Sequence, residues 1–395
     1  MSDRWRDAYK NKLRSADEAV ALIPDGASIV QPIIAGEPPA VLGAIADAAR
    51  AGTFTKLTMR ALLPFSATKA TVLQPDLKHV IRWESLFLGG ADREAVKEGR
   101  AGFTPNFFHQ VPRLLSEFIP VDVFIGTVSP MDKHGFMSLG VSVDYSTTAA
   151  RVAKVVILEV NEHMPRIHGR SFIHISEATA VVEHNAPIAE LPAPAMRPED
   201  EAIGKYIADM VPDGATLQLG IGGVPNAVAQ YLGSHKDLGI HSEMFTDSMV
   251  DLIEDGVANG VKKTLHPQKA VFTFAAGAER TYRFLDDNPY CESHPVSYTN
   301  NPDVIARNNQ LISVNAAIEV DLTGQCCAES FGHVQFSGTG GQADFVRGAF
   351  NSPGGKSFLA FYSTAKSGEV SRIVPTLTPG AAVTTPRQDV HYLVS

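Results

Sequence analysis

Two glycine-rich loops and one glutamate have the residue types and order that could do chemistry together. The loops are "LGIGGVPNAV" (219–228) and "SGTGGQADF" (337–345), and Glu243 lies between them along the chain. Because glycine has no side chain, backbone N–H groups in such a loop can approach a ligand closely. The helix N-terminus that follows favours anions and developing oxyanions. A tight strand-to-helix turn would also explain either loop alone, so the pattern predicts a ligand site only when the three features are taken together.

Three familiar site types do not fit these residues. The stretch from Gly338 to Ala343 has the form G-x-G-x-x-A, but a dinucleotide site needs an acidic residue about 20 positions later, and no Asp or Glu occurs over 345–368. The loop "NSPGGKSF" lacks the first glycine of a phosphate-binding loop, which falls on Phe350. No G-x-S-x-G nucleophile turn occurs, and the adjacent pair His241 and Ser242 would point to opposite faces of a strand.

The elements that must position these residues occur twice along the chain. Residues 23–42, "IPDGASIVQPIIAGEPPAVL", and residues 211–229, "VPDGATLQLGIGGVPNAVA", both run from a turn through a strand into a glycine loop and a helix. Between the copies lies the proline-rich stretch 186–198, which is typical of a linker. We therefore expect two related halves, 1–187 and 198–395, with the active site between them.

Each half alternates apolar strand-like runs with helical patterns. Examples of the strands are "VDVFIG", "KVVILEV" and "LISVNAAIEV", and examples of the helices are "PPAVLGAIADAARAG" and "PEDEAIGKYIADMV". Apolar strands that alternate with helices favour a parallel sheet with both faces covered. The predicted fold class is therefore α/β, with an open sheet in each half.

Composition excludes several kinds of partner. The net charge of −9 gives no basic surface for nucleic acid, and no apolar run is long enough to span a membrane. The N-terminal "MSDRWRDAYKNKLRSADEAV" has a charged, helical pattern and no export signal. Cys291, Cys326 and Cys327 form neither a plausible disulfide nor a zinc spacing. We expect a cytoplasmic protein with reduced thiols.

Ordered motifs along nearly the whole chain identify a family. They are "VSPMDKHGFMSLG", "NEHMPRIHG", "LGIGGVPNAV", "GIHSEM", "GTGGQADFVRGA", "SPGGKSF" and "SRIVP". In content and order they resemble the acetyl-CoA hydrolase/transferase family, a branch of the class I CoA-transferases. Members of this family usually continue beyond the motif that matches "VTTPRQDVHYLVS", so the resemblance also implies a final segment after Ser395.

The resemblance implies a role for specific residues. Glu243 of "GIHSEM" matches the covalent nucleophile of the family. The residues that match coenzyme A contacts are Gly220, Ile221, Gly222, Gly223, Val224, Ile318, Gly340, Gly341, Gln342 and Lys366. By this resemblance the substrates are acyl-CoA and small carboxylic acids, the transfer needs no metal, and the protein forms a homodimer or a higher homo-oligomer.

The function implied is transfer of coenzyme A between short carboxylic acids through a glutamyl-CoA thioester. Acetate, butyrate, 4-hydroxybutyrate, succinate and itaconate all fit, because pocket shape decides among them. The alternatives are an acyl-CoA hydrolase that uses the same glutamate and, more remotely, a non-catalytic acyl-CoA-binding module. In the transferase, the glycine loop at 220–223 is expected to donate N–H groups to the oxyanion.

For most of the remaining candidate residues, the sequence allows a functional and a structural interpretation. Glu37 in "GEPP" is the first-half counterpart of the catalytic loop and faces either the substrate or solvent. Asp132 and His134 line the cleft or stabilise a turn. Cys326 and Cys327 are expected to be packed, and Arg347 and Lys356 either bind coenzyme A phosphates or are surface charges.

Overall fold

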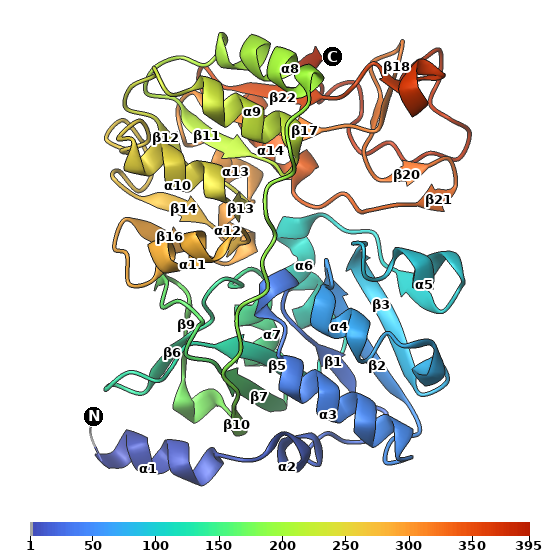
Figure 1. The fold of residues 1–395 in the computed structure, drawn as a ribbon, viewed down its shortest axis with the longest axis vertical. Helices are drawn as coiled ribbons and strands as arrows, with labels where there is room; N and C mark the ends of the chain where they lie inside the picture. Colours follow the sequence, from blue (N-terminus) through green and yellow to red (C-terminus); the bar gives the residue numbers. More distant parts are fainter. Residues whose placement is uncertain (1–2) are drawn as a thin grey trace.

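A computed structural model describes residues 3–395 as two lobes, each built on a parallel sheet (Figure 1). The seven-stranded sheet has the order β10-β7-β5-β1-β2-β3-β4, and every neighbouring pair is parallel. Its strands are β1 (Ser28–Val30), β2 (Leu57–Leu62), β3 (Ile81–Phe87), β4 (Ala101–Phe103), β5 (Val123–Val128), β7 (Val155–Val160) and β10 (Ala180–Glu183). The interior strand β5 is buried at every position, as a sheet covered on both faces requires.

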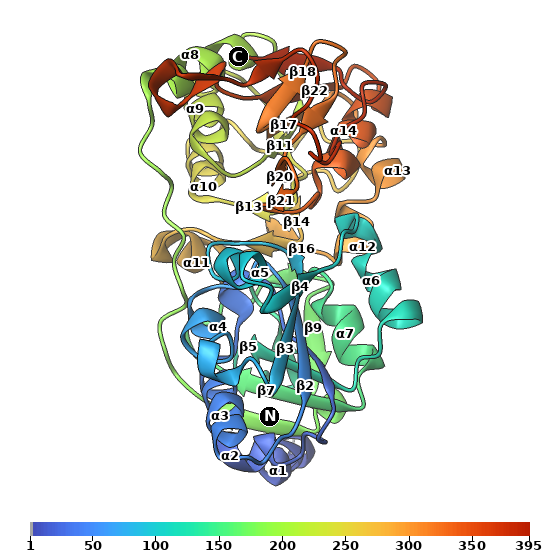
Figure 2. The ribbon, with the colours of Figure 1, turned by 90° about the vertical axis from the view of Figure 1, so that its right-hand side faces the viewer.

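The second lobe contains a five-stranded parallel sheet of order β12-β11-β17-β22-β26. Its strands are β11 (Thr216–Leu219), β12 (Gly239–Ile240), β17 (Leu311–Ala316), β22 (Lys356–Ala360) and β26 (Tyr392–Val394). Helices α8 (Pro198–Ala208) and α9 (Gly223–Tyr231) lie on one face, and α14 (Gln342–Asn351) lies on the other (Figure 2). The predicted α/β class with open parallel sheets is confirmed.

The other α-helices mostly alternate with strands, but two pairs of them follow one another along the chain with no strand between. They are α1 (Asp3–Lys12), α2 (Ala16–Val20), α3 (Pro39–Arg50), α4 (Ser66–Ala70), α5 (Arg93–Lys97), α6 (Val111–Arg113), α7 (Ser146–Val152), α10 (Asp247–Glu254), α11 (Glu279–Leu285), α12 (Val296–Thr299) and α13 (Pro302–Ile305). Within residues 3–395, no helix combines the length and the apolar character needed to cross a bilayer.

The internal repeat of the sequence appears as a repeated strand–loop–helix unit. In the first lobe β1 leads into α3, and in the second β11 leads into α9. Proline lies at the start of α3, where its missing N–H costs no helical bond. One expected strand is wrong as a single element, because "LISVNAAIEV" divides into β17 and β18 (Glu319–Asp321). The chain leaves the sheet after Ala316, where Ile318 N–H donates to Cys327 O at 2.7 Å.

The two lobes share a core and a small sheet. Strands β14 (Ala270–Phe272) and β16 (Cys291–Ser293) continue in parallel into β8 (His168–Gly169) of the first lobe. One cluster of buried apolar side chains extends from Val30 to Ala360 and includes both lobes. Residues 184–197, which contain no helix or strand, run along one side of the molecule between β10 and α8 (Figures 1 and 2).

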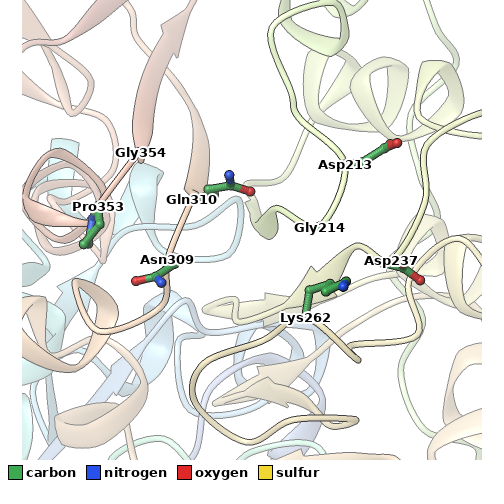
Figure 3. Close-up of a pocket in the computed structure, with 8 residues that line it drawn as sticks. All are labelled: Asp213, Gly214, Asp237, Lys262, Asn309, Gln310, Pro353 and Gly354. Atoms are coloured by element: carbon green, nitrogen blue, oxygen red, sulfur yellow. The ribbon is translucent and has the colours of Figure 1, made fainter.

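A polar pocket lies at the amino ends of the second sheet and is not the candidate site. Figure 3 shows Gly214 before β11, Gln310 before β17 and Gly354 before β22 around this hollow. In open parallel sheets ligands bind outside the carboxyl ends of the strands. The residues predicted from the sequence lie at that opposite edge.

Candidate active site

Four of the predicted site positions follow four adjacent strands of the second sheet. Glu243 comes after β12, the loop that starts at Gly220 comes after β11, Ile318 after β17 and Lys366 after β22. Because the strands are parallel, their carboxyl ends meet at one edge of the sheet. The topology therefore brings together residues that are more than a hundred positions apart in the sequence.

Glu243 is held by two donors that come from distant parts of the chain. Asn300 Nδ2 donates to Glu243 Oε2 at 2.6 Å, and the backbone N–H of Gly341 also donates to this carboxyl group. The main chain is fixed as well, since Glu243 O accepts from the N–H of Thr273 and of Phe274 at 3.0 and 3.2 Å. A nucleophile must be held in one orientation to attack efficiently.

Gly341 has to be a glycine because the carboxyl group lies against it. A methyl group added at its Cα would overlap with Glu243 Oε2 and with Asn300 Nδ2. Gly340, just before it, has a φ of 55°, which a residue with a side chain rarely adopts. The second glycine loop is thus shaped around the carboxyl group of Glu243.

The surroundings raise the pKa of Glu243 to about 8. Burial is the main cause, and the negative charge of Asp344 adds to it. The hydrogen bonds from Asn300 and Gly341 act in the opposite direction, because they stabilise the charged form. A carboxylate with a raised pKa is a stronger nucleophile once it is ionised, and perturbed groups of this kind mark functional sites.

The first glycine loop has one donor fewer than the sequence predicts. The N–H of Gly220 donates to Val314 O at 2.9 Å, within the sheet, so the expectation that it serves the oxyanion is wrong. Within residues 3–395, the N–H groups of Ile221, Gly222 and Gly223 have no backbone partner among the loop and cap hydrogen bonds. Gly222 has a φ of 126°, which requires glycine, and it caps α9, so that the helix N-terminus faces the loop. Val224 is buried beneath it.

A buried aspartate connects this loop with the groove that contains Lys366. A side chain at Gly223 would overlap with the carboxyl group of Asp200. Asp200 Oδ1 in turn accepts from Tyr362 Oη at 2.7 Å. Tyr362 and Lys366 line one groove together with Arg197 and Arg372. Two predicted coenzyme A contacts, Gly223 and Lys366, are thereby linked, and the groove contains three cationic side chains alongside Glu199.

The other predicted contacts lie beside the second glycine loop. Gln342 is the first residue of α14, and its Nε2 donates to Ala316 O at 2.6 Å, beside the end of β17. Ile318 is half-buried two residues further along. The structure thus places these side chains at the same sheet edge, where their role in binding remains a prediction.

The first lobe reaches this site through two segments that the sequence did not single out. Phe87 lies against Gly338 and Gly340, whose missing side chains leave room for its ring. Phe108 N–H donates to Gly340 O at 3.1 Å. His109 binds both oxygens of the buried Asp344, through its N–H at 3.1 Å and Nδ1 at 2.7 Å. The first lobe thereby fixes the loop that contacts Glu243.

Several secondary candidates have structural roles. Glu37 is buried and caps α4, accepting from the N–H groups of Phe65, Ala67 and Thr68, so neither substrate nor solvent faces it. Its backbone partners are too far along the chain to be read from "GEPP". His241 is buried, with Nε2 beside Thr299 O at 2.8 Å.

The other secondary candidates are also explained by packing and pairing. Asp132 accepts from the N–H groups of His134 and Phe136, which is the turn-stabilising reading. Cys326 and Cys327 are buried and free, as expected. Arg347 pairs with Asp389 and Lys356 donates to Met210 O, both within the protein.

Two family models match this chain. One describes the acetyl-CoA hydrolase/transferase N-terminal domain and matches residues 1–192, and the other describes the C-terminal domain and matches residues 277–395. The chain belongs to the acetyl-CoA hydrolase/transferase family. The family predicted from the motifs is therefore confirmed.

Two relatives that match nearly all of this chain have CoA-transferase names. The succinyl-CoA:cyclohexane-1-carboxylate CoA transferase of Geobacter metallireducens is 48% identical, covering 99% of this chain and 88% of the relative. The 4-hydroxybutyrate coenzyme A transferase of Clostridium kluyveri is 45% identical, covering 99% and 90%. The crystal structure of RipA from Yersinia pestis has a TM-score of 0.94 at 44% identity, covering 98% and 90%. The predicted enzyme class, a CoA-transferase, is confirmed.

Proposed function

We propose that the protein transfers coenzyme A between short carboxylic acids through a thioester on Glu243. The observation that carries this proposal is the carboxyl group of Glu243, held by Asn300 and Gly341 at the carboxyl edge of the second sheet. The groove with Lys366, Arg197 and Arg372 is the proposed path of the anionic end of coenzyme A.

The first step moves the acyl group from coenzyme A to Glu243. Ionised Glu243 attacks the thioester carbonyl carbon, and the N–H groups of Ile221, Gly222 and Gly223 are the proposed donors to the oxyanion. When the intermediate collapses, the C–S bond breaks and the thiolate of coenzyme A leaves. The product is a mixed anhydride between the acyl group and Glu243, which is reactive towards both thiolate and carboxylate.

The second step moves coenzyme A onto the glutamate. The thiolate attacks the side-chain carbonyl carbon of Glu243, and the free acid leaves as a carboxylate. The oxyanion of this step forms on the side chain of Glu243, where Asn300 Nδ2 and the Gly341 N–H already donate. These donors are thus preorganised for the glutamyl intermediate. An incoming acid then reverses the two steps, and no proton is gained or lost overall.

Exclusion of water separates a transferase from a hydrolase in this scheme. Phe87 and the fully buried Phe108 bring apolar surface from the first lobe to the second glycine loop. Because water would hydrolyse either acyl intermediate, a closed and apolar surrounding favours transfer to an acid. The full-length relatives with transferase names support the same choice. The acid that accepts coenzyme A is proposed as acetate, butyrate, 4-hydroxybutyrate or a dicarboxylate such as succinate or itaconate.

An acid panel tests the function. The enzyme is incubated with acetyl-CoA and each acid in turn, and new acyl-CoA and free thiol are measured separately. We expect acid-dependent exchange without net release of thiol. Release of thiol without exchange would select the hydrolase, and neither reaction would select a binding module. Light scattering on the same preparation tests the proposed homo-oligomer. The location of the protein in the cytoplasm remains a prediction.

A further inference from the structure

A cluster of two histidines and a glutamate lies outside the site described above. His266 Nδ1 is 3.0 Å from Glu292 Oε2, and His294 Nε2 is 3.1 Å from the same oxygen. All three atoms lie within 4.8 Å of one another. Within residues 3–395, these two nitrogens and this oxygen have hydrogen-bond partners only inside the cluster. Three side-chain atoms that can each bind a metal ion therefore lie close together.

The donor set and its spacing suit a transition-metal ion. Two imidazoles and one carboxylate are the protein ligands of many zinc sites, with ligand distances of about 2.0–2.2 Å. Ligands at such distances around a tetrahedral ion are separated from one another by about 3.3 Å, close to the 3.0 and 3.1 Å found here. Lys269 approaches the other oxygen of Glu292, Oε1, at 3.9 Å, which leaves Oε2 as the single carboxylate ligand.

The way in which the ligands are presented supports this reading. Glu292 and His294 are two residues apart at the end of β16, so they project from the same face of the strand. The other nitrogen of His266, Nε2, is 2.7 Å from Tyr298 Oη, and metal-bound histidines usually have a partner of this kind. His266 itself has a φ of 49°, and backbone strain of this type gathers at functional sites.

Access from solvent is open, while the ligand ends are sheltered. The side chains of His266 and Glu292 are 24% and 21% exposed, and that of His294 is 8% exposed. An ion could enter past His266 and Glu292 and leave one coordination position for water, as in open zinc sites.

We infer that His266, Glu292 and His294 bind a divalent transition-metal ion of the zinc type. The mechanism proposed for Glu243 uses no metal, so the proposed role of this ion is structural. A bound ion would affect the neighbouring segment, residues 298–300. Tyr298 of α12 contacts His266, and His294 O accepts from Thr299 Oγ1 at 3.4 Å. Asn300, the residue that binds Glu243, follows directly. A bound ion would hold the base of the segment that places Asn300.

Zinc titration of the full-length protein tests the site. After removal of metals by a chelator, binding of ZnCl2 is measured by calorimetry, and the thermal midpoint is recorded with and without zinc. We expect one ion per chain and a rise in the midpoint. Glu292→Gln and His294→Gln should abolish both effects. Tyr298→Phe keeps all three ligands and should weaken binding by about tenfold or more.

The matched control is His168→Gln. His168 Nε2 also pairs with a carboxylate, Asp287 Oδ1, at 3.0 Å, and its side chain is 37% exposed. Among the described residues no third His, Cys, Asp or Glu joins this pair. This variant should bind zinc as the wild type does. If the wild type binds no zinc, or if Glu292→Gln binds it equally well, the assignment is wrong. If Glu292→Gln does not fold, the other two variants decide. Unchanged zinc binding by Tyr298→Phe together with loss of zinc binding by His168→Gln would contradict the assignment of the site.

Discussion

At the scale of single residues, Glu243 has a raised pKa, and hydrogen bonds hold its carboxyl group in one orientation. Burial and Asp344 raise its pKa to about 8, while Asn300 and Gly341 donate to it. This balance keeps part of the population protonated at neutral pH. In the proposed mechanism, the rate of attack depends on the ionised fraction of Glu243 and on the donors that stabilise the charged form.

The first prediction is the pH dependence of kcat/KM. Only the ionised glutamate attacks, so kcat/KM should rise with pH and level off above the pKa of about 8. Asn300→Leu removes a donor that favours the charged form, so its profile should move to higher pH and its maximum should fall by about 100-fold. Initial rates from neutral to alkaline pH measure both. A flat profile, or a shift of Asn300→Leu to lower pH, would contradict the assignment of the titrating group.

The second prediction concerns the space at Gly341. The added methyl group of Gly341→Ala would overlap with Glu243 Oε2. Because a displacement of about 1 Å can cost about 100-fold in rate, activity should fall at least that far. Gly43→Ala is the matched control, since nothing lies within 4 Å of its Cα substituent inside α3. It should keep full activity and gain about 0.5–1 kcal/mol in stability. Equal activities of the two variants would contradict the assignment of Gly341 to the active site.

At the scale of elements, α14 connects the first lobe with Glu243, the proposed nucleophile. Asp344, in the first turn of α14, binds His109 through both of its carboxyl oxygens. The N–H of Gly341, just before the helix, donates to Glu243. Burial raises the pKa of Asp344, and His109 opposes this by stabilising the carboxylate. The pair therefore positions the glycine loop and also contributes charge to the site.

The third prediction separates these two effects of Asp344. Asp344→Asn keeps the size and removes the charge that raises the pKa of Glu243. The pH profile of kcat/KM should move to lower pH, even if the maximum falls because the contact with His109 is weaker. A residue with a purely structural role would lower the maximum without moving the profile. His109→Asn, which keeps the backbone donor, serves as the comparison.

The sequence predicted the elements better than the contacts between them. The strands in "VDVFIG" and "KVVILEV" were predicted because burial on both faces leaves a continuous apolar run. The helical pattern predicted α3, of which only part is buried. Asn300 was missed, since "TNNP" is typical of a turn, and nothing in it indicates a contact with Glu243. Glu37 was misjudged for the same reason: its partners at 65–68 meet it only after the chain has folded.

At the scale of the whole molecule, two sheets form one structural unit. Strand β8 of the first lobe pairs with β16 of the second, and one buried apolar cluster includes side chains from both lobes. Removing either lobe would expose part of this core. Separation of the lobes is therefore costly, even though an extended segment, 184–197, connects them.

The fourth prediction is a single cooperative unfolding transition. Because the apolar cluster extends from Val30 to Ala360, loss of one lobe should destabilise the other. Scanning calorimetry and circular dichroism should give one coincident transition. Two separated transitions, each with part of the total enthalpy, would show that the lobes unfold independently.

The covalent intermediate on Glu243 is the most direct test of the whole account. The protein is incubated with acetyl-CoA in the absence of an acceptor acid, digested, and analysed by peptide mass spectrometry. The peptide that contains "GIHSEM" should carry coenzyme A on Glu243, and prior reduction with borohydride should remove the adduct. Glu243→Gln should bind acetyl-CoA, carry no adduct and lose transfer by several orders of magnitude. Full transfer by Glu243→Gln, or an adduct on Cys326 or Cys327 in its place, would contradict the account.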